Sequence, residues 1–251
     1  MSTHLTVLIP NYNERGNVER GVIDEVLSYL KKQPYTWEIL ISDDGSTDNS
    51  LELLGKYTKL DTRIRVLKND HAGKPYALRS GISKAQGKYI ILTDMDQSTP
   101  IKELDKLLPW TEQGYQVVIG SRGAKRADSS LIRQLASVIF LSVRRLILLP
   151  EIKDTQCGFK LIDASVAKQI FARMRIFGRA NNVTGWKVTA YDVEVLHLAK
   201  KMGIKIKEVR VVWKNEDTSN GKSRNFIKES LEMLFEIMRV RANDILGKYD
   251  R

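Results

Sequence analysis

The sequence predicts an α/β fold in which a mostly parallel sheet is flanked by helices. Short apolar runs alternate with segments of helical period through the first half of the chain. The strand-like runs are followed by polar or acidic residues, as expected where strands end at a ligand-binding edge. The chain has 251 residues, of which 42% are hydrophobic, enough for one large domain with an ordinary core.

The first half of the chain alternates strand and helix signals, as βαβ units do. Strands are expected at residues 5–9, 38–42, 64–67, 89–93 and 116–119. Between the first two strands, apolar residues recur at helical spacing from Val22 to Leu30. Asp48 or Asn49 can cap a helix that runs to about residue 59. Another helix is expected at residues 76–85.

The second half is richer in helix signals. A long amphipathic helix is expected at residues 129–149, then a loop at 154–160, helices at 164–174 and 192–202, a strand at 205–213 and a final helix at 225–246. The sequence contains neither a linker rich in Pro, Gly or Ser nor an internal repeat. We therefore expect one domain over residues 1–251 with two functional halves, 1–120 and 121–251.

Composition limits the classes of partner. The formal net charge of +11, from 41 Lys and Arg against 30 Asp and Glu, predicts a surface that attracts phosphates, anionic lipid or nucleic acid. The sequence contains no recognised nucleic-acid-binding motif. A single cysteine, Cys157, excludes an intrachain disulfide framework and predicts a reducing, cytoplasmic setting. We find neither a signal peptide nor an apolar run of the roughly 20 residues that a spanning helix needs.

Three acidic or polar turns follow the first, second and fourth predicted strands. They comprise residues 10–14, residues 43–48 and residues 94–97. Parallel strands would bring all three to one edge of the sheet. Asp94 and Asp96, two positions apart on a tight turn, can share Mg²⁺, which takes one or two carboxylates and completes its shell with phosphates and water. An Asp-rich turn also caps helices and favours turn geometry, so a single one of them would be weak support for a site.

Other catalytic and phosphate-binding devices do not fit. Residues 221–223, Gly-Lys-Ser, imitate the end of a P-loop, but Glu216 stands where the first glycine is required. The sequence has neither a Gly-x-Gly-x-x-Gly fingerprint nor a Gly-x-Ser-x-Gly elbow. His4, His71 and His197 are too far apart in sequence to indicate a metal cluster, so we expect surface or packing histidines.

The ordered motifs resemble the family 2 inverting glycosyltransferases of the GT-A fold. The resemblance spans nearly the whole chain and is carried by residues 9–14 (Ile-Pro-Asn-Tyr-Asn-Glu), 43–46 (Asp-Asp-Gly-Ser), 73–81 and the Asp94-x-Asp96 pair. The later motifs are similar to the branch that glucosylates dolichyl phosphate, with the dolichyl-phosphate mannose synthases next. These motifs are residues 120–122, Arg133 with Ser137, residues 154–160 (Asp-Thr-Gln-Cys-Gly-Phe-Lys) and residues 191–194.

The resemblance implies a donor site at the predicted edge of the sheet. Asp94 and Asp96 would hold Mg²⁺ or Mn²⁺ on the diphosphate of a nucleotide sugar, where a metal stabilises the charge of the leaving group. The residues implied in nucleotide-sugar binding are Pro10, Tyr12, Glu14, Asp43 or Asp44, Lys74 and, in a basic loop with Arg224, Lys222.

The resemblance also implies an acceptor site in the second half. Arg122 and Arg133, with Ser137, match positions that bind the acceptor phosphate, and the planar fork of arginine suits phosphate oxygens. A phosphate acceptor is largely ionised near neutral pH and hardly needs a general base. A sugar hydroxyl would need one, and Asp154 is the candidate. We expect Asp154 to act in positioning first and as a base second.

A polyprenyl acceptor would be met at a bilayer surface. The predicted helix at 129–149 and the final helix combine apolar stripes with arginines and lysines, so both are candidates for the membrane interface. Ordinary core helices have the same pattern. We expect peripheral association, at the cytoplasmic membrane face, favoured by positive charge on anionic lipid.

The function expected from the resemblance is the transfer of a hexose, with glucose from UDP-glucose favoured, to a polyprenyl phosphate with inversion. Two alternatives keep the fold and the metal site: a transferase that uses GDP-mannose, and one that acts on a sugar hydroxyl. A basic nucleic-acid-binding module fits less well, because an acidic site repels phosphate unless a metal is present.

Overall fold

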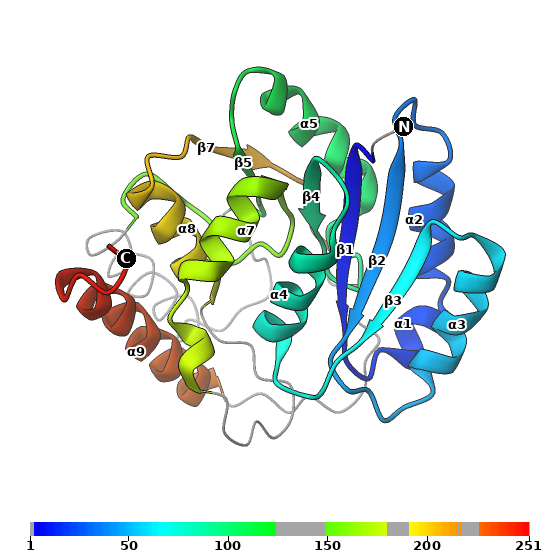
Figure 1. The fold of residues 1–251 in the computed structure, drawn as a ribbon, viewed down its shortest axis with the longest axis horizontal. Helices are drawn as coiled ribbons and strands as arrows, with labels where there is room; N and C mark the ends of the chain where they lie inside the picture. Colours follow the sequence, from blue (N-terminus) through cyan, green and yellow to red (C-terminus); the bar gives the residue numbers. More distant parts are fainter. Residues whose placement is uncertain (1–2, 124–148, 180–190, 215, 217–225, 251) are drawn as a thin grey trace.

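The computed structural model describes residues 3–123, 149–179, 191–214, 216 and 226–250, with only the backbone described for 226–233. Figure 1 shows a twisted sheet with helices on both faces. Its seven strands follow the order β3-β2-β1-β4-β6-β5-β7. Their bounds are β1 Leu5–Asn11, β2 Trp37–Asp43, β3 Ile64–Lys68, β4 Tyr89–Leu92, β5 Val117–Ser121, β6 Lys160–Asp163 and β7 Ile206–Arg210.

The sheet is mostly parallel, which confirms the predicted fold class. The strand β1 pairs in parallel with β2 and β4, as β2 does with β3 and β5 with β7. The strand β6 runs antiparallel between β4 and β5. Sequence reasoning missed β6, because four residues directly after a loop motif carry too little periodicity to predict a strand.

The helices form two layers because the side chains of the strands alternate between the faces of the sheet. On β1, Leu8 packs into one core with α4, α7, α8 and α9, whereas Val7 and Ile9 pack into a second core with α2, α3 and α5. The bounds are α1 Arg15–Glu19, α2 Val22–Leu30, α3 Ser50–Leu60, α4 Lys74–Lys84, α5 Leu104–Glu112, α7 Ala164–Arg173, α8 Tyr191–Lys201 and α9 Phe226–Ile245, with 3-10 turns at Ile101–Glu103 and Ile176–Arg179.

Most predicted elements are present within two residues of their expected ends. Sequence reasoning missed α1 and α5, the second of which contains Pro109 within a helical segment. The helix predicted at 129–149 lies outside the described residues, apart from its last position, Leu149, which is buried.

The order of the strands predicts a ligand site at one edge of the sheet. The chain continues from β1 to β2 on one side and later returns to β4 on the other, which makes the carboxyl ends of these strands a switch point. Asn11 is in register with Asp43 at that edge. Because β6 is antiparallel, its first residue, Lys160, pairs with Leu92 at the end of β4. The motif at 154–160 is thereby brought to the same edge as the acidic turns.

Candidate functional site

The turn after β1 forms one wall of the site. Pro10 is the penultimate residue of β1 and is in register with Ser42 of β2. The next turn carries Tyr12, which is partly buried, and Glu14, which is buried and accepts a hydrogen bond from Asn17 Nδ2 at 2.6 Å. Asn13 has a φ of 53°, a left-handed conformation that is uncommon for a residue with a side chain. Its Oδ1 accepts from Thr47 N at 2.8 Å and so joins this turn to the next.

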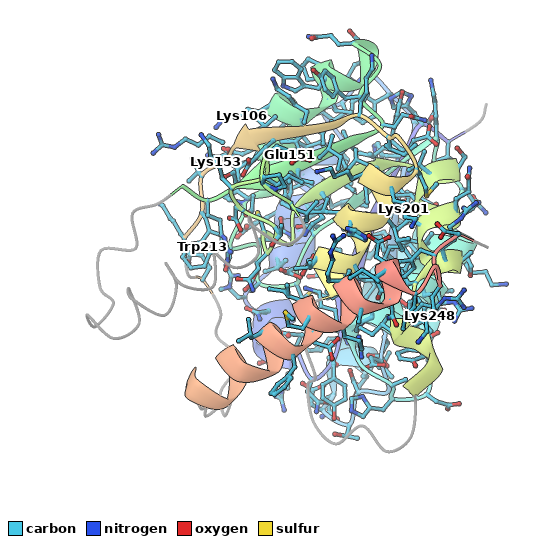
Figure 2. The ribbon with its side chains drawn as sticks, turned by 90° about the vertical axis from the view of Figure 1, so that its left-hand side faces the viewer. Lys106, Glu151, Lys153, Lys201, Trp213 and Lys248 are labelled. Atoms are coloured by element: carbon cyan, nitrogen blue, oxygen red, sulfur yellow. The ribbon has the colours of Figure 1, made fainter. Side chains whose placement is uncertain are left out.

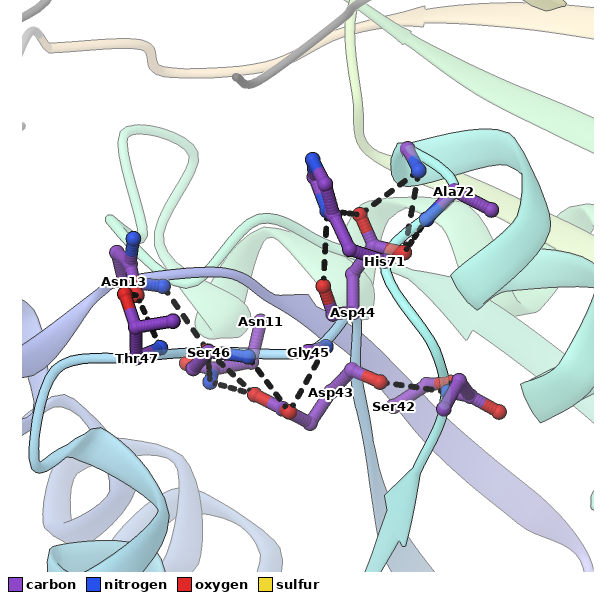
Figure 3. A network of polar contacts seen from close by, with 12 residues as sticks. Asn11, Asn13, Ser42, Asp43, Asp44, Gly45, Ser46, Thr47, His71 and Ala72 are labelled. Atoms are coloured by element: carbon purple, nitrogen blue, oxygen red, sulfur yellow. Dashed lines mark hydrogen bonds and ion pairs between the residues drawn. The ribbon is translucent and has the colours of Figure 1, made fainter. Parts of the chain in front are cut away.

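The carboxylate of Asp43 holds the turn after β2 together (Figure 3). It accepts hydrogen bonds from Asn11 Nδ2 at 2.6 Å, from the amides of Gly45 and Ser46 at 3.1 and 3.0 Å, and from Ser46 Oγ at 2.5 Å. Four donors on one buried carboxylate nearly fill its acceptor capacity. The role of Asp43 in this structure is therefore to hold residues 43–46 in their turn conformation.

Asp44 has a comparable set of protein partners. Its fully buried carboxylate accepts from the amides of Ala72 and Gly73, at 2.9 and 2.8 Å, and from His71 Nδ1 at 2.9 Å. Burial raises the pKa of Asp44, and the two amides and His71 oppose that rise. The ring of His71 stacks on Tyr12 with centroids 4.2 Å apart (Figure 3 shows His71 above Asp44). His71, predicted as a surface or packing histidine, is partly buried and packs between Tyr12 and Asp44.

The segment from His71 to Lys74 connects the second acidic turn to the third. Gly73 has a φ of 98°, which a side chain would strain, and it precedes α4. Lys74, the first residue of α4, extends its Nζ to 2.5 Å from Asp94 Oδ1. Adjacent residues therefore contact the two acidic turns, Gly73 through its amide to Asp44 and Lys74 through its ammonium to Asp94.

Asp94 lies among positive charges. Besides Lys74, the ammonium of Lys160 and the guanidinium of Arg122 act on its carboxylate. Partial burial raises the pKa of Asp94, but these three cations outweigh burial and hold the pKa below its ordinary value. The carboxylate is therefore ionised at neutral pH, and its side chain is 40% exposed.

Hydrogen bonds from Gln97, Ser98 and Arg20 fix the Asp94–Asp96 turn. Gln97, with a φ of 48°, donates from Nε2 to the carbonyl of Asp94 at 2.9 Å and to Thr93 Oγ1 at 3.0 Å. Asp96 Oδ1 accepts from Ser98 N at 2.9 Å, and the carbonyl of Asp96 accepts from Arg20 at 2.7 Å. A left-handed residue directly after the acidic pair is the kind of strain that persists at ligand sites.

The two carboxylates fit a divalent cation that is completed by substrate. Gly158 packs against Asp94 so closely that an added Cβ would lie 2.9 Å from Asp94 Cγ. A side chain at position 158 would therefore displace the carboxylate of Asp94. Within the described ranges, no group of three or more His, Cys, Asp and Glu side chains forms a metal cage. Mg²⁺ and related cations commonly take one or two protein carboxylates with phosphate and water, so Asp94 and Asp96 match that ligand set.

Arg122 and Asp154 form a bidentate ion pair. Asp154 accepts from Arg122 Nε at 2.8 Å, from Nη2 at 2.9 Å and from the Arg122 amide at 3.0 Å. Burial favours the neutral acid, but hydrogen bonds and charge from Arg122 prevail and lower the pKa of Asp154 to about 2. The positioning role of Asp154 stays a prediction. Contact between Arg122 and an acceptor phosphate stays a prediction, because two guanidinium nitrogens of Arg122, Nε and Nη2, already donate to Asp154.

A second buried ion pair joins the two motifs of the second half. Lys160 Nζ lies 2.5 Å from Asp192 Oδ1 and also donates to the carbonyl of Cys157. Only 1% of the Lys160 side chain is exposed. Because a buried ammonium needs its partners, this pair fixes the loop at 154–160 against the start of α8. Glu194, two residues after Asp192, is buried and accepts from Arg175 N and Tyr249 Oη.

The structure brings together most of the predicted site residues. Pro10, Tyr12, Asp43 and Asp44 line one side of the edge, and Lys74, Asp94, Arg122 and Asp154 belong to the linked charge network beside it. The predicted residues Arg133, Ser137 and Lys222 lie outside the described residues. Sequence reasoning missed His71 and treated Lys160 as only the last letter of a motif. For Lys160 the sequence carried no clear signal, because the short strand that it begins was itself not predicted.

Comparison with known proteins agrees with this geometry. Residues 6–171 match the model of the family described as Glycosyl transferase family 2. The dolichyl-phosphate beta-glucosyltransferase of Dictyostelium discoideum is 31% identical over 262 aligned residues, which cover 97% of this chain and 76% of that protein.

Solved structures share the fold. Glucosyl-3-phosphoglycerate synthase from Mycobacterium tuberculosis, in complex with UDP, superposes with a TM-score of 0.62 at 16% identity, over 96% of this chain and 80% of that one. A mannosyltransferase from Pyrobaculum calidifontis, in complex with GDP-Man and Mn²⁺, gives 0.61 at 16% identity, over 98% of this chain and 65% of that one. At these identities the likeness concerns the fold alone.

Proposed function

The chain belongs to glycosyl transferase family 2, and on that premise we propose that it transfers glucose from UDP-glucose to a polyprenyl phosphate with inversion. The name of the Dictyostelium relative, a dolichyl-phosphate beta-glucosyltransferase, supports both the sugar and the acceptor. The observation in the site that carries the proposal is the ion pair between Asp154 and Arg122.

This ion pair favours a phosphate acceptor over a sugar hydroxyl. A hydroxyl acceptor must lose its proton to a base, and an efficient base has a pKa near the working pH. Asp154, the candidate base, has a pKa of about 2 and is held by the fork of Arg122. A phosphate monoester, with a second pKa of about 6, arrives ionised and attacks without losing a proton. The site is thus suited to an acceptor that brings its own charge.

The donor side follows from the other carboxylates. Asp94 and Asp96 would hold Mg²⁺ or Mn²⁺, which when bound supplies positive charge to the leaving diphosphate. Lys74 adds a cation at the amino-terminal end of α4, where the helix dipole also favours an anion. Tyr12, stacked on His71, offers an aromatic surface for a base. In the transfer, an acceptor phosphate oxygen forms the new bond to the sugar carbon as the bond from that carbon to the UDP phosphate breaks.

The choice between UDP-glucose and GDP-mannose rests on the relatives. The fold neighbours include one structure with UDP and one with GDP-Man, so the fold is compatible with either nucleotide. The curated relatives from Dictyostelium, yeast and human are all named as beta-glucosyltransferases of dolichyl phosphate. We therefore favour glucose, with GDP-mannose as the alternative donor to be tested.

An exposed apolar stripe on α9 supports association with a bilayer. Phe235, Met238, Ile245 and Leu246 are between 50% and 72% exposed, whereas Ile237 and Val240 on the other side of the helix are buried. Figure 2 shows α9 along the outside of the molecule, with Lys248 near its carboxyl end. Arg241 and Lys248 are exposed there and suit anionic headgroups. In the part of the chain that the structure describes, no helix has the length and apolar character to cross a membrane.

The test is a transfer assay with separated phases. Purified protein is mixed with radiolabelled UDP-glucose or GDP-mannose, Mg²⁺ or Mn²⁺, and polyprenyl phosphate in detergent, and label in the organic phase is counted. We expect metal-dependent label from UDP-glucose. Label from GDP-mannose alone would replace the donor in the proposal. Label that never leaves the aqueous phase, although a donor binds, would overturn the lipid acceptor.

A further inference from the structure

Lys74 occupies an unusual place for a lysine. It is the first residue of α4, where the dipole of the helix disfavours a positive charge, and the first turn contains no acidic residue. Its side chain is only 10% exposed. Burial lowers the pKa of Lys74, but the negative charges of Asp94 and Asp192 and the hydrogen bond to Asp94 more than reverse that effect and raise the pKa. A buried, charged lysine at a helix start requires a compensating anion, and Asp94 supplies it at 2.5 Å.

The three cations near Asp94 differ in their partners. Arg122 is paired with Asp154, and Lys160 is paired with Asp192. Among the described residues, the carboxylate that forms an ion pair with Lys74 is Asp94 itself, through Oδ1. Asp94 is also one of the two carboxylates that fit a divalent cation. Lys74 and a metal ion therefore compete for the same carboxylate.

We propose that Lys74 is the counter-ion of Asp94 in the free protein, so that a divalent cation binds weakly alone and more tightly together with the nucleotide diphosphate. The inference rests on the proposed function, since it takes Asp94 and Asp96 as the metal carboxylates. A cation that enters alone meets the ammonium of Lys74 at short range, and two like charges at that distance repel strongly in a partly buried site. A diphosphate brings negative charge for both cations, and the ammonium can move from Asp94 to a phosphate oxygen.

Two features of the structure support such a movement. The side chain of Lys74 starts at the amino-terminal end of α4, a position that favours phosphate binding. The neighbouring amides of Ala72 and Gly73 are bound to Asp44, so the backbone on which Lys74 is mounted stays fixed while the side chain moves. Thermodynamic linkage then makes the coupling reciprocal, because cation and nucleotide raise the affinity of the site for each other by the same factor.

The experiment measures Mn²⁺ binding, without turnover. Free Mn²⁺ is followed by electron paramagnetic resonance during titration of the full chain, with and without UDP. For the wild-type protein we expect weak binding of Mn²⁺ alone and an increase of at least about 10-fold with UDP, in the usual range of coupling between sites. For Lys74→Met, which removes the charge and keeps the length of the stem, we expect Mn²⁺ alone to bind about 10-fold more tightly and the gain from UDP to shrink.

Three variants control the interpretation. Lys74→Arg keeps the charge and should behave as the wild type does towards Mn²⁺ alone. Lys84→Met removes an exposed lysine from the other end of α4 and should change nothing. Lys74→Gln provides a second charge removal if the methionine variant does not fold, as judged by circular dichroism.

The outcomes separate this inference from the proposed function. If the wild type binds Mn²⁺ with UDP but Lys74→Met binds Mn²⁺ alone no more tightly than the wild type, the inference is overturned and the metal site stands. If the wild type binds no Mn²⁺ even with UDP, or if Asp94→Asn binds it equally well, the metal site of the proposed function fails and the inference fails with it.

Discussion

The acidic turns after β2 and β4 look alike in the sequence and differ in the structure. Asp43 and Asp44 receive hydrogen bonds from backbone amides, from Asn11, from Ser46 and from His71. Asp94 is 40% exposed, and the partner at its Oδ1 is the ammonium of Lys74, a side chain and not a backbone amide. In the turn after β2 the carboxylates stabilise the loop through hydrogen bonds. In the turn after β4, Asp94 is exposed enough to bind a ligand in place of Lys74, as we propose above.

The difference teaches how to read acidic turns at a sheet edge. A carboxylate that accepts from several fixed amides has little capacity left for a ligand, and its removal disturbs the fold. A carboxylate held by cationic side chains can exchange them for a metal, because the cations can turn to the phosphates. We therefore expect substitutions in the two turns to affect different properties, stability in one and catalysis in the other.

The largest expected effect is on activity in the β4 turn. Asp94→Asn keeps the shape of the side chain but removes the charge that would hold the metal on the leaving diphosphate. We expect kcat/KM to fall by about 10²–10³-fold, the usual effect of losing one electrostatic contribution to a transition state. The measurement is the phase-partition assay at saturating metal, with circular dichroism as the control for folding. Activity within 3-fold of the wild type would contradict the assignment of Asp94 as a ligand.

The next effect is on stability in the β2 turn. Asp43→Ala leaves the backbone amides of Gly45 and Ser46 without their acceptor and removes the shortest of the hydrogen bonds of the Asn11 side-chain amide, which also donates to Ser46 Oγ and Ser50 Oγ. We expect the free energy of unfolding to fall by about 2–3 kcal/mol, in line with unsatisfied buried donors. Urea unfolding measures it. The matched variant Asp43→Asn keeps an acceptor oxygen and should lose less, so equal losses would argue against hydrogen bonding as the cause.

Asp154 represents a third kind of carboxylate, held by a cation that is itself buried. Its pKa of about 2 in the folded protein lies below the ordinary 3.8, so on acidification the unfolded chain takes up the proton first. The stability that Asp154 contributes is present above about pH 5 and is lost as the pH falls towards 2. Between pH 6 and pH 3 we expect the wild type to lose about 1 kcal/mol more than Asp154→Asn. Urea unfolding at both pH values measures this, and equal losses would place the pKa of Asp154 near its ordinary value.

Much of the fold could be predicted from the sequence because periodicity and strand ends carry strong signals. The apolar spacing from Val22 to Leu30 gave α2 with its observed ends, and the polar residues after each strand located the site edge. The sequence also singled out Asp94 and Asp96, because two carboxylates two positions apart after a strand match the ligands that Mg²⁺ takes, and their role as metal ligands stays a prediction.

What the sequence could not give were the contacts between distant segments. Nothing in the local pattern pairs Lys160 with Asp192, 32 positions away, or His71 with Asp44 and Tyr12. The contact of Lys160 with Asp192 depends on β6 running antiparallel, and the four residues of β6 were too few for a periodic signal. The sequence also did not show that Arg122 forms a bidentate ion pair with Asp154.

The smallest expected effect is on membrane binding by α9. Like the two acidic turns, this helix has some side chains held by the protein and others that are open to a ligand. Ile237 and Val240 are committed to the core, whereas Phe235 and Ile245, each 72% exposed, are available to a bilayer. Phe235→Glu should weaken binding to vesicles with anionic lipid by about 3–10-fold, because one aromatic side chain less is buried and a negative charge is added. Flotation with vesicles measures it. Leu60→Glu, which places the same charge at a 77% exposed leucine at the end of α3, is the matched control. If both variants bind equally less, net charge alone attracts the protein, and the stripe on α9 is not the contact.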